Sequence, residues 1–487
     1  MAVKNKVQLI TYPDSLGGNL KELNSVLNGT LKGLFNGGVH ILPPFPSSGD
    51  RGFAPVDYFE IEKTFGTWDD IRSIGRNHDV VIDLMVNHIS RQSVYFRDFL
   101  EKGTESRYKD LFITMDKIWE KGVPVKEDVD KIFLRRESPF SEYDIAGGKK
   151  VKLWTTFGKT DPSEQIDIDV RSDAAKGLFL DILRNFSING VKIVRLDAIG
   201  YVIKKPGTSC FFVEPEIYEF LDWISNIARQ FGLVLLPEVH AHHSIQFRLA
   251  SKGFWIYDFI LPYRILEALL LKRFDRLADY LKERPRNQFT MIDCHDGLPV
   301  IPDLNDMIDV ESARKIVDIC VMRGSNLSKV YSNAHKLEGD FDVHQIRGTI
   351  YSMLNENDDD YIIARAIQFF VPGIPQVYYV GLLAGVNKYE REKETGDGRE
   401  INRYNYSVDE IGNELKREVV QRLIRLIRFR NSHKSFDGSF TVKKASDAEL
   451  VLMWENSGHM SRLSVDIEKR QARIEYSDNG AVNEFLA

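Results

Sequence analysis

Short runs of apolar residues alternate with amphipathic segments along most of this chain. Eight runs have the length and the β-branched content of buried strands, at residues 7–12, 39–42, 80–86, 191–196, 233–237, 255–260, 289–293 and 376–380. Segments with helical periodicity follow several of them, at 19–34, 68–76, 174–186, 217–231 and 265–281. Eight strands with helices between them predict an α/β fold, a (β/α)8 TIM barrel whose active site lies at the C-terminal ends of the strands.

Two spacings interrupt this alternation. The third and fourth predicted strands are separated by far more residues than a crossover helix needs, and a second long segment separates the seventh from the eighth. After a predicted helix at 416–430, the tail alternates apolar and polar residues as antiparallel strands do. We therefore predict a barrel of residues 1–88, 167–297 and 358–434, inserted domains at 89–166 and 298–357, and a C-terminal antiparallel β-domain at 435–487.

The composition is that of an ordinary soluble protein, with 43% hydrophobic and 28% charged residues among 487. A formal net charge of -6 argues against nucleic acid or an anionic membrane as the main partner. The chain has no run of about eighteen apolar residues, which a transmembrane helix would need. We expect a monomer or a homodimer without a membrane partner.

The cysteines indicate the compartment. Cys210, Cys294 and Cys320 are odd in number and show no C-x-x-C spacing, so neither a disulfide framework nor a zinc site is predicted. The N-terminus leads into the first predicted strand without the apolar core of a signal peptide. Both observations favour a cytoplasmic protein.

The fourth predicted strand ends in Arg195-Leu196-Asp197. Alternation along a strand puts Arg195 and Asp197 on one face. An acid beside a guanidinium stays ionised at neutral pH, which suits a carboxylate that attacks carbon or stabilises a cation. An isolated Arg-x-Asp is more often a structural ion pair, so its meaning depends on the other strand ends.

Polar residues gather at those other ends as well. The third strand ends near Asp83 and His88, the fifth at Glu238, and the seventh at His295 and Asp296. The C-terminal ends of barrel strands meet at one face, where barrel enzymes keep their catalytic residues. Three carboxylates after strands four, five and seven, with two histidines, indicate a catalytic site.

These four motifs, in this order, resemble those of the α-amylase superfamily of glycoside hydrolases and transglycosylases, family 13. The resemblance covers nearly the whole chain, and it implies that Asp197 is the nucleophile, Glu238 the general acid/base, and Asp296 the residue that holds sugar hydroxyls and distorts the ring. Retention of an α-linkage takes two carboxyls about 5–5.5 Å apart. Glu238 follows an apolar run and has no cation near it in the sequence, so we expect burial to keep it protonated while Arg195 keeps Asp197 ionised. This chemistry needs no cofactor and no metal.

A narrower resemblance is to the sucrose phosphorylase branch of that superfamily. It is carried by four segments: 49–58, Trp154-Thr155-Thr156-Phe157, Glu164-Gln165-Ile166-Asp167 and Arg399-Glu400-Ile401-Asn402-Arg403. The resemblance implies a closed pocket for one glucosyl unit, with Asp50 and Arg403 on its 4-hydroxyl. It also implies that the remaining substrate-binding residues are Phe53, His88, Phe157, Gln165, Arg195 and His295. The alternative is that these are loop charges, core rings and satisfied core histidines.

Phosphorolysis requires that inorganic phosphate, rather than water, attacks the glucosyl enzyme, so the acceptor side must offer cations and exclude water. The resemblance assigns this side to the loops 133–140 and 340–345, the latter with Asp342 and Gln345. Here the chain departs from the usual sucrose phosphorylase pattern, in which a tyrosine stands at the place of His344 and a proline interrupts the stretch at Arg135 and Arg136.

If that departure is functional, Arg135, Arg136 and His344, with Lys336, form a second anion site. The substrates would then be a sugar phosphate and inorganic phosphate, in the reaction of sucrose 6'-phosphate and phosphate to α-glucose 1-phosphate and fructose 6-phosphate. The alternatives are that these residues bind only inorganic phosphate or merely vary on the surface. Sucrose, glucosylglycerol or glucosylglycerate would then be the substrate.

Functions of other classes make different predictions. A non-catalytic amylase-like binding protein should lack one of the three carboxylates, whereas all three are present. A hydrolase differs only in whether water reaches the intermediate, which the sequence does not decide. His240, His242 and His243 look like a ligand cluster, yet no carboxylate but Glu238 lies at ligand spacing, so metal catalysis is not expected.

Overall fold

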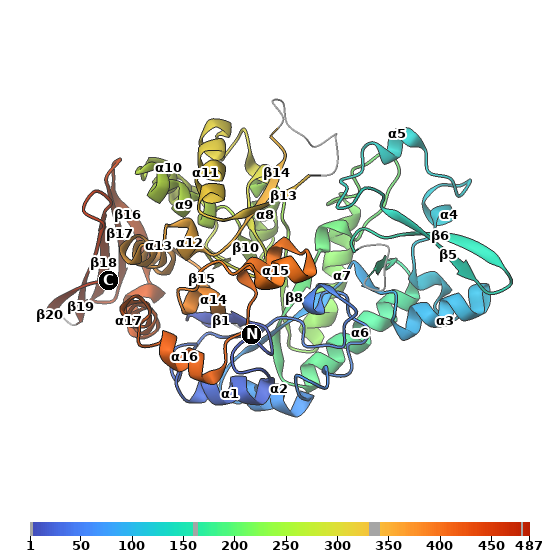
Figure 1. Ribbon diagram of the computed structural model, residues 1–487, viewed down its shortest axis with the longest axis horizontal. Helices are drawn as coiled ribbons and strands as arrows, with labels where there is room; N and C mark the ends of the chain where they lie inside the picture. Colours follow the sequence, from blue (N-terminus) through green and yellow to red (C-terminus); the bar gives the residue numbers. More distant parts are fainter. Residues whose placement is uncertain (1–2, 159–163, 331–340, 479–480) are drawn as a thin grey trace. The chain divides into compact units, whose positions relative to one another are not determined.

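The computed structural model describes residues 3–158, 164–330, 341–478 and 481–487 (Figure 1). The chain divides into two compact units. The first unit comprises Ile41–Val239 and the described part of Lys329–Asp342. The second comprises Ala2–His40, His240–Ser328 and Val343–Ala487, again in their described residues.

Eight strands form the main sheet: β1 (Gln8–Thr11), β2 (Gly38–Ile41), β3 (Val80–Met85), β8 (Val191–Asp197), β9 (Val234–Pro237), β10 (Ile256–Asp258), β11 (Gln288–Thr290) and β15 (Ile374–Tyr378). Their order is β10-β11-β15-β1-β2-β3-β8-β9, which is chain order around a nearly closed barrel. Each strand coincides with one of the eight predicted runs. The predicted (β/α)8 barrel is therefore confirmed.

Within the first unit, β8 is paired in parallel with β3 on one side and with β9 on the other. Val80–Met85 is buried along its whole length, as expected of a parallel strand covered on both faces. The register sets Asp83 opposite Arg195 and Met85 opposite Asp197. The helices of this part of the barrel are α2 (Trp68–Gly75), α6 (Asp173–Ile188) and α7 (Glu216–Gln230).

The segment between β3 and α6 forms a small substructure with its own core. It contains α3 (Val94–Lys102), α4 (Met115–Ile118), α5 (Lys126–Val129) and the antiparallel pair β5 (Phe140–Ile145) and β6 (Lys149–Trp154). The Trp119 and Trp154 rings stack 5.9 Å apart inside it. The short strands β4 (His88–Ser90) and β7 (Gln165–Asp167), where the segment begins and ends, pair antiparallel with His88 opposite Asp167. The predicted boundary at 89–166 stays a prediction.

In the second unit, β15 is paired in parallel with β1 and with β11, and β11 with β10. Its helices are α1 (Leu20–Asn28), α8 (His243–Ser251), α9 (Leu261–Leu271), α10 (Asp275–Glu283), α11 (Val310–Met322), α12 (Ile350–Met353), α13 (Asp358–Phe370), α14 (Tyr379–Leu382), α15 (Glu390–Thr395), α16 (Val408–Glu414) and α17 (Glu418–Ser432). The single helix predicted at 265–281 is wrong. The chain breaks it at Lys272, whose φ of 54° lies in the left-handed region and ends α9.

Two further sheets complete the described chain. A three-stranded sheet has the order β12-β14-β13, with β12 (Leu298–Pro299), β13 (Asn326–Lys329) and β14 (Val343–Arg347). The C-terminal sheet is the predicted antiparallel domain, and its strands β16 (Ser439–Ala445), β17 (Glu449–Asn456), β18 (His459–Asp466), β19 (Gln471–Asp478) and β20 (Ala481–Leu486) lie in chain order. The Trp454 indole donates to Phe370 O, which fixes this sheet to α13.

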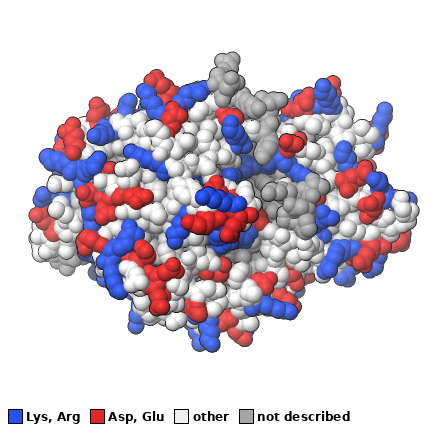
Figure 2. All heavy atoms as spheres, in the orientation of Figure 1, with Lys and Arg blue, Asp and Glu red and all other residues white. Residues whose placement is uncertain are grey.

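Charges of both signs are interspersed over the face drawn in Figure 2, as expected for a chain with a small net charge. None of the described helices combines the length and the apolar character that a membrane-spanning helix requires.

Candidate active site

One guanidinium holds three carboxylates together in the first unit. Arg195 Nη1 pairs with Asp83 and lies 2.8 Å from Asp197 Oδ1, and Arg195 Nη2 lies 3.2 Å from Glu238 Oε1. Arg195 is buried, with 3% of its surface exposed. The predicted pairing of Arg195 with Asp197 is present, and the end of β9 brings Glu238 to the same cation.

Glu238 is held by the backbone as well. Its Oε2 accepts a hydrogen bond of 3.1 Å from the N–H of Ala198, whose φ of 55° lies in the left-handed region. The sequence suggested that Glu238 has no cation beside it. That was wrong, because Arg195 reaches Glu238 from a neighbouring strand.

This arrangement changes the expected protonation. Burial raises the pKa of Asp197, Arg195 lowers it, and the Glu238 and Asp83 carboxylates raise it further, so that it lies well above its usual value. Three carboxylates around one cation, of which Asp83 is buried and the other two are largely buried, carry excess negative charge, which favours binding of a proton. We expected Arg195 to keep Asp197 ionised; Arg195 does lower the pKa of Asp197, but burial and the two neighbouring carboxylates oppose it. Asp197 and Glu238 therefore influence each other's protonation, since both contact Arg195 and the charge of Glu238 raises the pKa of Asp197.

Two phenylalanine rings and a histidine ring lie close together beside Arg195. The His88 Nε2 lies 3.0 Å from Phe53 O, and its ring centroid lies 5.3 Å from that of Phe157. Burial lowers the pKa of His88, so the ring is neutral and able to donate from one nitrogen and accept at the other. The Phe53 ring lies 5.8 Å from Arg195 Cζ. The predicted Phe53, His88, Phe157 and Arg195 are thus brought together.

Asp50 lies on a turn with an unusual backbone. Asp50 and Arg51 have φ of 49° and 48°, a conformation that residues with a Cβ rarely adopt. Gly52 follows with φ of 107°, and a Cβ there would lie 2.6 Å from Pro43 O. Such strained turns occur at ligand-binding sites, where the surrounding structure holds them in place.

Two residues of this unit were not singled out in the sequence. Burial raises the pKa of Tyr201 to about 12, with Arg135 lowering it and Glu238 raising it, so the Tyr201 hydroxyl stays protonated next to the carboxylates. Lys204 is buried, and its Nζ lies 2.7 Å from Asp167 Oδ2 and 3.0 Å from Asn87 Oδ1. The only signal for either was its position shortly after Asp197.

The adjacent arginines of the first acceptor loop point in different directions. Arg136 Nη1 lies 2.8 Å from Oε1 of the buried Glu164 and 3.2 Å from Thr155 Oγ1. Arg135 instead lies 5.9 Å from the centroid of the Phe157 ring and interacts with Tyr201. Arg135 therefore lies beside Phe157 and Tyr201, whereas Arg136 is held by Glu164 and Thr155.

Gln165 is almost fully buried in β7, with 2% of its surface exposed. Its Oε1 has no hydrogen-bond partner among the residues that the structure describes. A buried amide oxygen without a partner costs free energy unless a ligand or water binds it. This is consistent with the predicted contact of Gln165 to substrate.

The second unit holds Asp296 among cations. Asp296 Oδ1 lies 3.5 Å from Arg403 Nη2 and 3.7 Å from Arg399 Nη1, and its Oδ2 lies 3.5 Å from His295 Nε2. Burial raises the pKa of Asp296, but His295, Arg399 and Arg403 outweigh it and bring the pKa well below the usual range. Asp296 is therefore ionised, and Arg403, which also donates to His295 O at 2.8 Å, fixes the pair.

The second acceptor loop continues into β14. His344 is 3% exposed, and Gln345 Nε2 lies 3.2 Å from His240 Nδ1. His344 is therefore not an exposed loop residue, as one alternative supposed. Asp342 pairs with Lys329 at 3.1 Å in the first unit. Lys336 lies outside the described residues.

Comparison with known proteins adds to this geometry. Residues 13–249 match the family "Alpha amylase, catalytic domain". The chain is 58% identical to sucrose 6(F)-phosphate phosphorylase of Thermoanaerobacterium thermosaccharolyticum, over 100% of both chains. It is 43% identical to sucrose phosphorylase of Streptococcus mutans, over 98% of this chain and 99% of that one.

A solved structure is similar over the same length. The crystal structure of sucrose 6F-phosphate phosphorylase from Thermoanaerobacter thermosaccharolyticum matches with a TM-score of 0.98 and 57% identity, covering 100% of this chain and 99% of that one. The similarity thus extends over every element described above.

Proposed function

Because this chain belongs to the α-amylase family, and within it to the sucrose and sucrose 6(F)-phosphate phosphorylases, we propose that it is a disaccharide phosphorylase that acts on sucrose 6'-phosphate. The reaction is the reversible conversion of sucrose 6'-phosphate and inorganic phosphate into α-glucose 1-phosphate and fructose 6-phosphate. The observation that carries the proposal is the pair of carboxylates Asp197 and Glu238 on one buried guanidinium, in a chain 58% identical to a named phosphorylase of this substrate.

The first half-reaction breaks the glycosidic bond. Asp197 Oδ attacks the anomeric carbon of the glucosyl unit, and the proton of the Asp197 and Glu238 pair passes from Glu238 to the departing fructosyl oxygen. Fructose 6-phosphate leaves, and a covalent glucosyl-Asp197 remains. The Arg195 contact to both carboxylates supports this step, because it lets the negative charge move between them without a change in the cation's position.

The second half-reaction releases the glucosyl unit. An oxygen of inorganic phosphate attacks the anomeric carbon, the bond to Asp197 breaks, and Glu238 takes up a proton from the phosphate. Two inversions give retention, so the product is α-glucose 1-phosphate. Exclusion of water is essential here, and the rings of Phe53 and Phe157 would supply apolar walls on the side of His88.

The glucosyl hydroxyls have candidate partners in both units. In the first, His88, Gln165 and Asp50 are proposed to bind the ring, supported by the neutral state of His88 and by the Gln165 oxygen, which no described residue hydrogen-bonds. In the second, Asp296, His295 and Arg403 are proposed for the same purpose, supported by the ionised state of Asp296. The assignment of Asp296 to the catalytic set depends on the order of the motifs along the chain.

The 6'-phosphate needs cations of its own. We assign this role to Arg135 and His344, since Arg136 is engaged by Glu164. Charge-assisted hydrogen bonds to a phosphate are shorter and stronger than neutral ones, so two such donors give clear discrimination against unphosphorylated sucrose. Asp342 and Gln345 would complete the acceptor side.

The deciding experiment measures α-glucose 1-phosphate released from sucrose 6'-phosphate and from sucrose, side by side in phosphate buffer. We expect kcat/KM to be at least about a hundredfold higher for the phosphorylated sugar, as two charge-assisted contacts would give. Preference for sucrose would make the chain a sucrose phosphorylase and remove the acceptor assignment. Release of free glucose without glucose 1-phosphate would refute phosphorolysis.

A further inference from the structure

Two histidines and two aspartates, none of them assigned above to sugar or phosphate, converge in the second unit. His242 and His243 stand at the start of α8, Asp303 ends the short helix η5 (Ile301–Asp303), and Asp306 follows it. The sequence offered no carboxylate but Glu238 at ligand spacing beside these histidines. The fold supplies two, from a segment about sixty residues further along the chain.

The four side chains already face one another. His243 Nδ1 lies 2.8 Å from Asp303 Oδ1 and 3.9 Å from Asp306 Oδ2, and His242 Nε2 lies 2.9 Å from Asp306 Oδ2. One donor atom each of His242, His243 and Asp303 lie within 4.8 Å of one another. Ligands bound at about 2.0–2.2 Å in a tetrahedron lie roughly 3.3 Å apart, so small side-chain rotations suffice to enclose an ion.

Neighbouring contacts orient the donor atoms. His242 Nδ1 lies 2.9 Å from Ser244 Oγ and accepts from the Ser244 backbone N–H at 3.3 Å, so the ring is oriented by the start of α8. Asp303 Oδ1 accepts from the backbone N–H of His243 at 2.7 Å, which fixes this carboxylate at the helix start. Both interactions are of the kind that hold ligands of natural metal sites in place.

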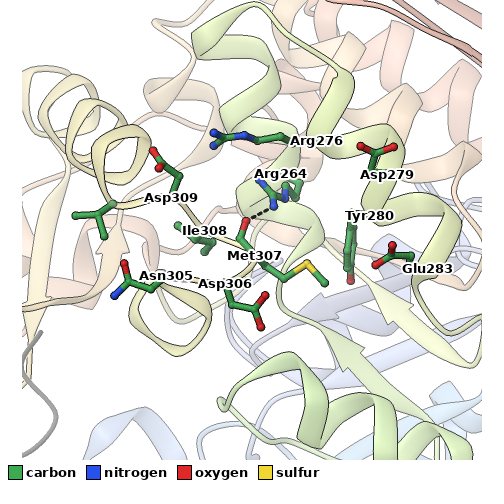
Figure 3. Close-up of a pocket in the computed structure, with 11 residues that line it drawn as sticks. Arg264, Arg276, Asp279, Tyr280, Glu283, Asn305, Asp306, Met307, Ile308 and Asp309 are labelled. Carbon is green, nitrogen blue, oxygen red and sulfur yellow. Dashed lines mark hydrogen bonds between the residues drawn. The ribbon is translucent and has the colours of Figure 1, made fainter.

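An ion can reach the cluster from solvent. The side chains of His242 and Asp306 are 38% and 55% exposed, and Asp306 also lines a surface pocket of about 580 Å³. Figure 3 shows Asp306 beside Met307 in this pocket, with Asp279 and Glu283 on the side of Tyr280. The cluster combines two imidazole rings with two carboxylates, whose negative charge would attract a divalent cation.

We propose that His242, His243, Asp303 and Asp306 bind one divalent transition-metal ion, with Zn²⁺ as the best fit. Two imidazoles and two carboxylates suit zinc, which prefers four nitrogen, sulfur or oxygen ligands in a tetrahedron, whereas calcium and magnesium favour sites of oxygen alone. The ion would have a structural role. It would link the start of α8, at His242 and His243, to the end of η5 and the loop after it, at Asp303 and Asp306.

The test is zinc binding by the full-length, untagged protein after removal of metal with a chelator. Isothermal titration should give one Zn²⁺ per chain, and zinc should raise the thermal unfolding temperature, since it binds only the folded state. The variants H242Q and D306N alter the two exposed ligands, which bear little on folding, and each should weaken binding by at least about tenfold. D279N, which alters a carboxylate of the same pocket outside the cluster, should bind as the unaltered protein does.

A second measurement addresses geometry. Co²⁺ in place of zinc should give the intense visible absorption of a four-coordinate site, and H242Q should lose it. Absence of stoichiometric Zn²⁺ binding would refute the proposal and leave Asp303 as a cap of α8. Binding that H242Q and D306N leave unchanged would place the ion elsewhere and would refute it equally. Neither result depends on which sugar the enzyme uses.

Discussion

Arg195 Nη2 lies 3.2 Å from Glu238 Oε1, so the group assigned as acid/base shares its cation with the group assigned as nucleophile. Asp83, opposite Arg195 in the register of β3 and β8, is the third carboxylate on this guanidinium. The charge at Asp83 therefore influences how tightly the catalytic pair holds its proton.

Asp83→Asn should shift the pH dependence of activity. The negative charge of Asp83 raises the pKa of Asp197, so its removal lowers that pKa, and the pair loses its proton at a lower pH. In the proposed mechanism the pair of Asp197 and Glu238 is active with one proton bound, so the alkaline limb of kcat/KM should move to lower pH. Initial rates between about pH 5 and 9 measure the limb, and a thermal melt checks that the variant is folded. An unmoved limb in a folded variant would show that Asp83 has no influence on the pair.

Asp197→Asn and Glu238→Gln should fail at different steps. The Asp197→Asn variant cannot form the covalent intermediate, so no glucosyl enzyme should appear in the mass spectrum with any donor. The Glu238→Gln variant cannot protonate a leaving sugar, which costs about 10²–10⁴-fold in rate, yet α-glucosyl fluoride needs no such proton and should still label Asp197. Turnover by Asp197→Asn at the rate of the unaltered enzyme would end the double-displacement mechanism.

The two adjacent arginines offer a matched pair of variants. Arg135→Gln should raise KM for sucrose 6'-phosphate by about tenfold to a hundredfold and leave sucrose nearly unaffected, because one charge-assisted contact is worth about 1.5–3 kcal/mol. Arg136→Gln breaks the contact to Glu164 and should affect both substrates alike. Equal effects of Arg135→Gln on both substrates would remove Arg135 from the 6'-phosphate.

His344→Tyr tests the other proposed phosphate ligand. The His344 side chain is buried in β14. The substitution therefore replaces a buried imidazole, the proposed phosphate donor, by a phenol. We expect the ratio of kcat/KM for sucrose 6'-phosphate over sucrose to fall by about tenfold or more. Phosphorolysis of sucrose itself serves as the internal control, and an unchanged ratio would exclude His344 from phosphate binding.

Lys204→Met should destabilise the first unit strongly. It leaves Asp167 as a buried carboxylate without its cation, at a cost of about 3–5 kcal/mol. The double variant Lys204→Met with Asp167→Asn should recover part of this loss, because no unpaired charge remains. Urea unfolding followed by tryptophan fluorescence gives the comparison. A single variant within about 0.5 kcal/mol of the unaltered protein would mean that the pair contributes nothing to stability.

The barrel strands were predictable because parallel strands covered on both faces are nearly continuous apolar runs, and such runs stand out in the sequence. The break between α9 and α10 could not be predicted. It depends on the left-handed conformation of Lys272, and a lysine, unlike a glycine, does not indicate such a conformation in the sequence. The contact of Arg195 with Glu238 was missed for another reason. Arg195 lies in β8 and Glu238 follows β9. Spacing along the sequence does not show which cation of one strand contacts a carboxylate of the next strand.

The pairing of β4 with β7 has a consequence for how such enzymes diversify. Since His88 and Asp167 face each other across one short ladder, the chain leaves the barrel and returns to it at nearly the same point. This ladder is therefore one of the points that anchor the segment between β4 and β7, in its described residues, to the barrel. A longer, shorter or unrelated segment could be exchanged there, as a route to new acceptors, while the ladder keeps His88 in its register.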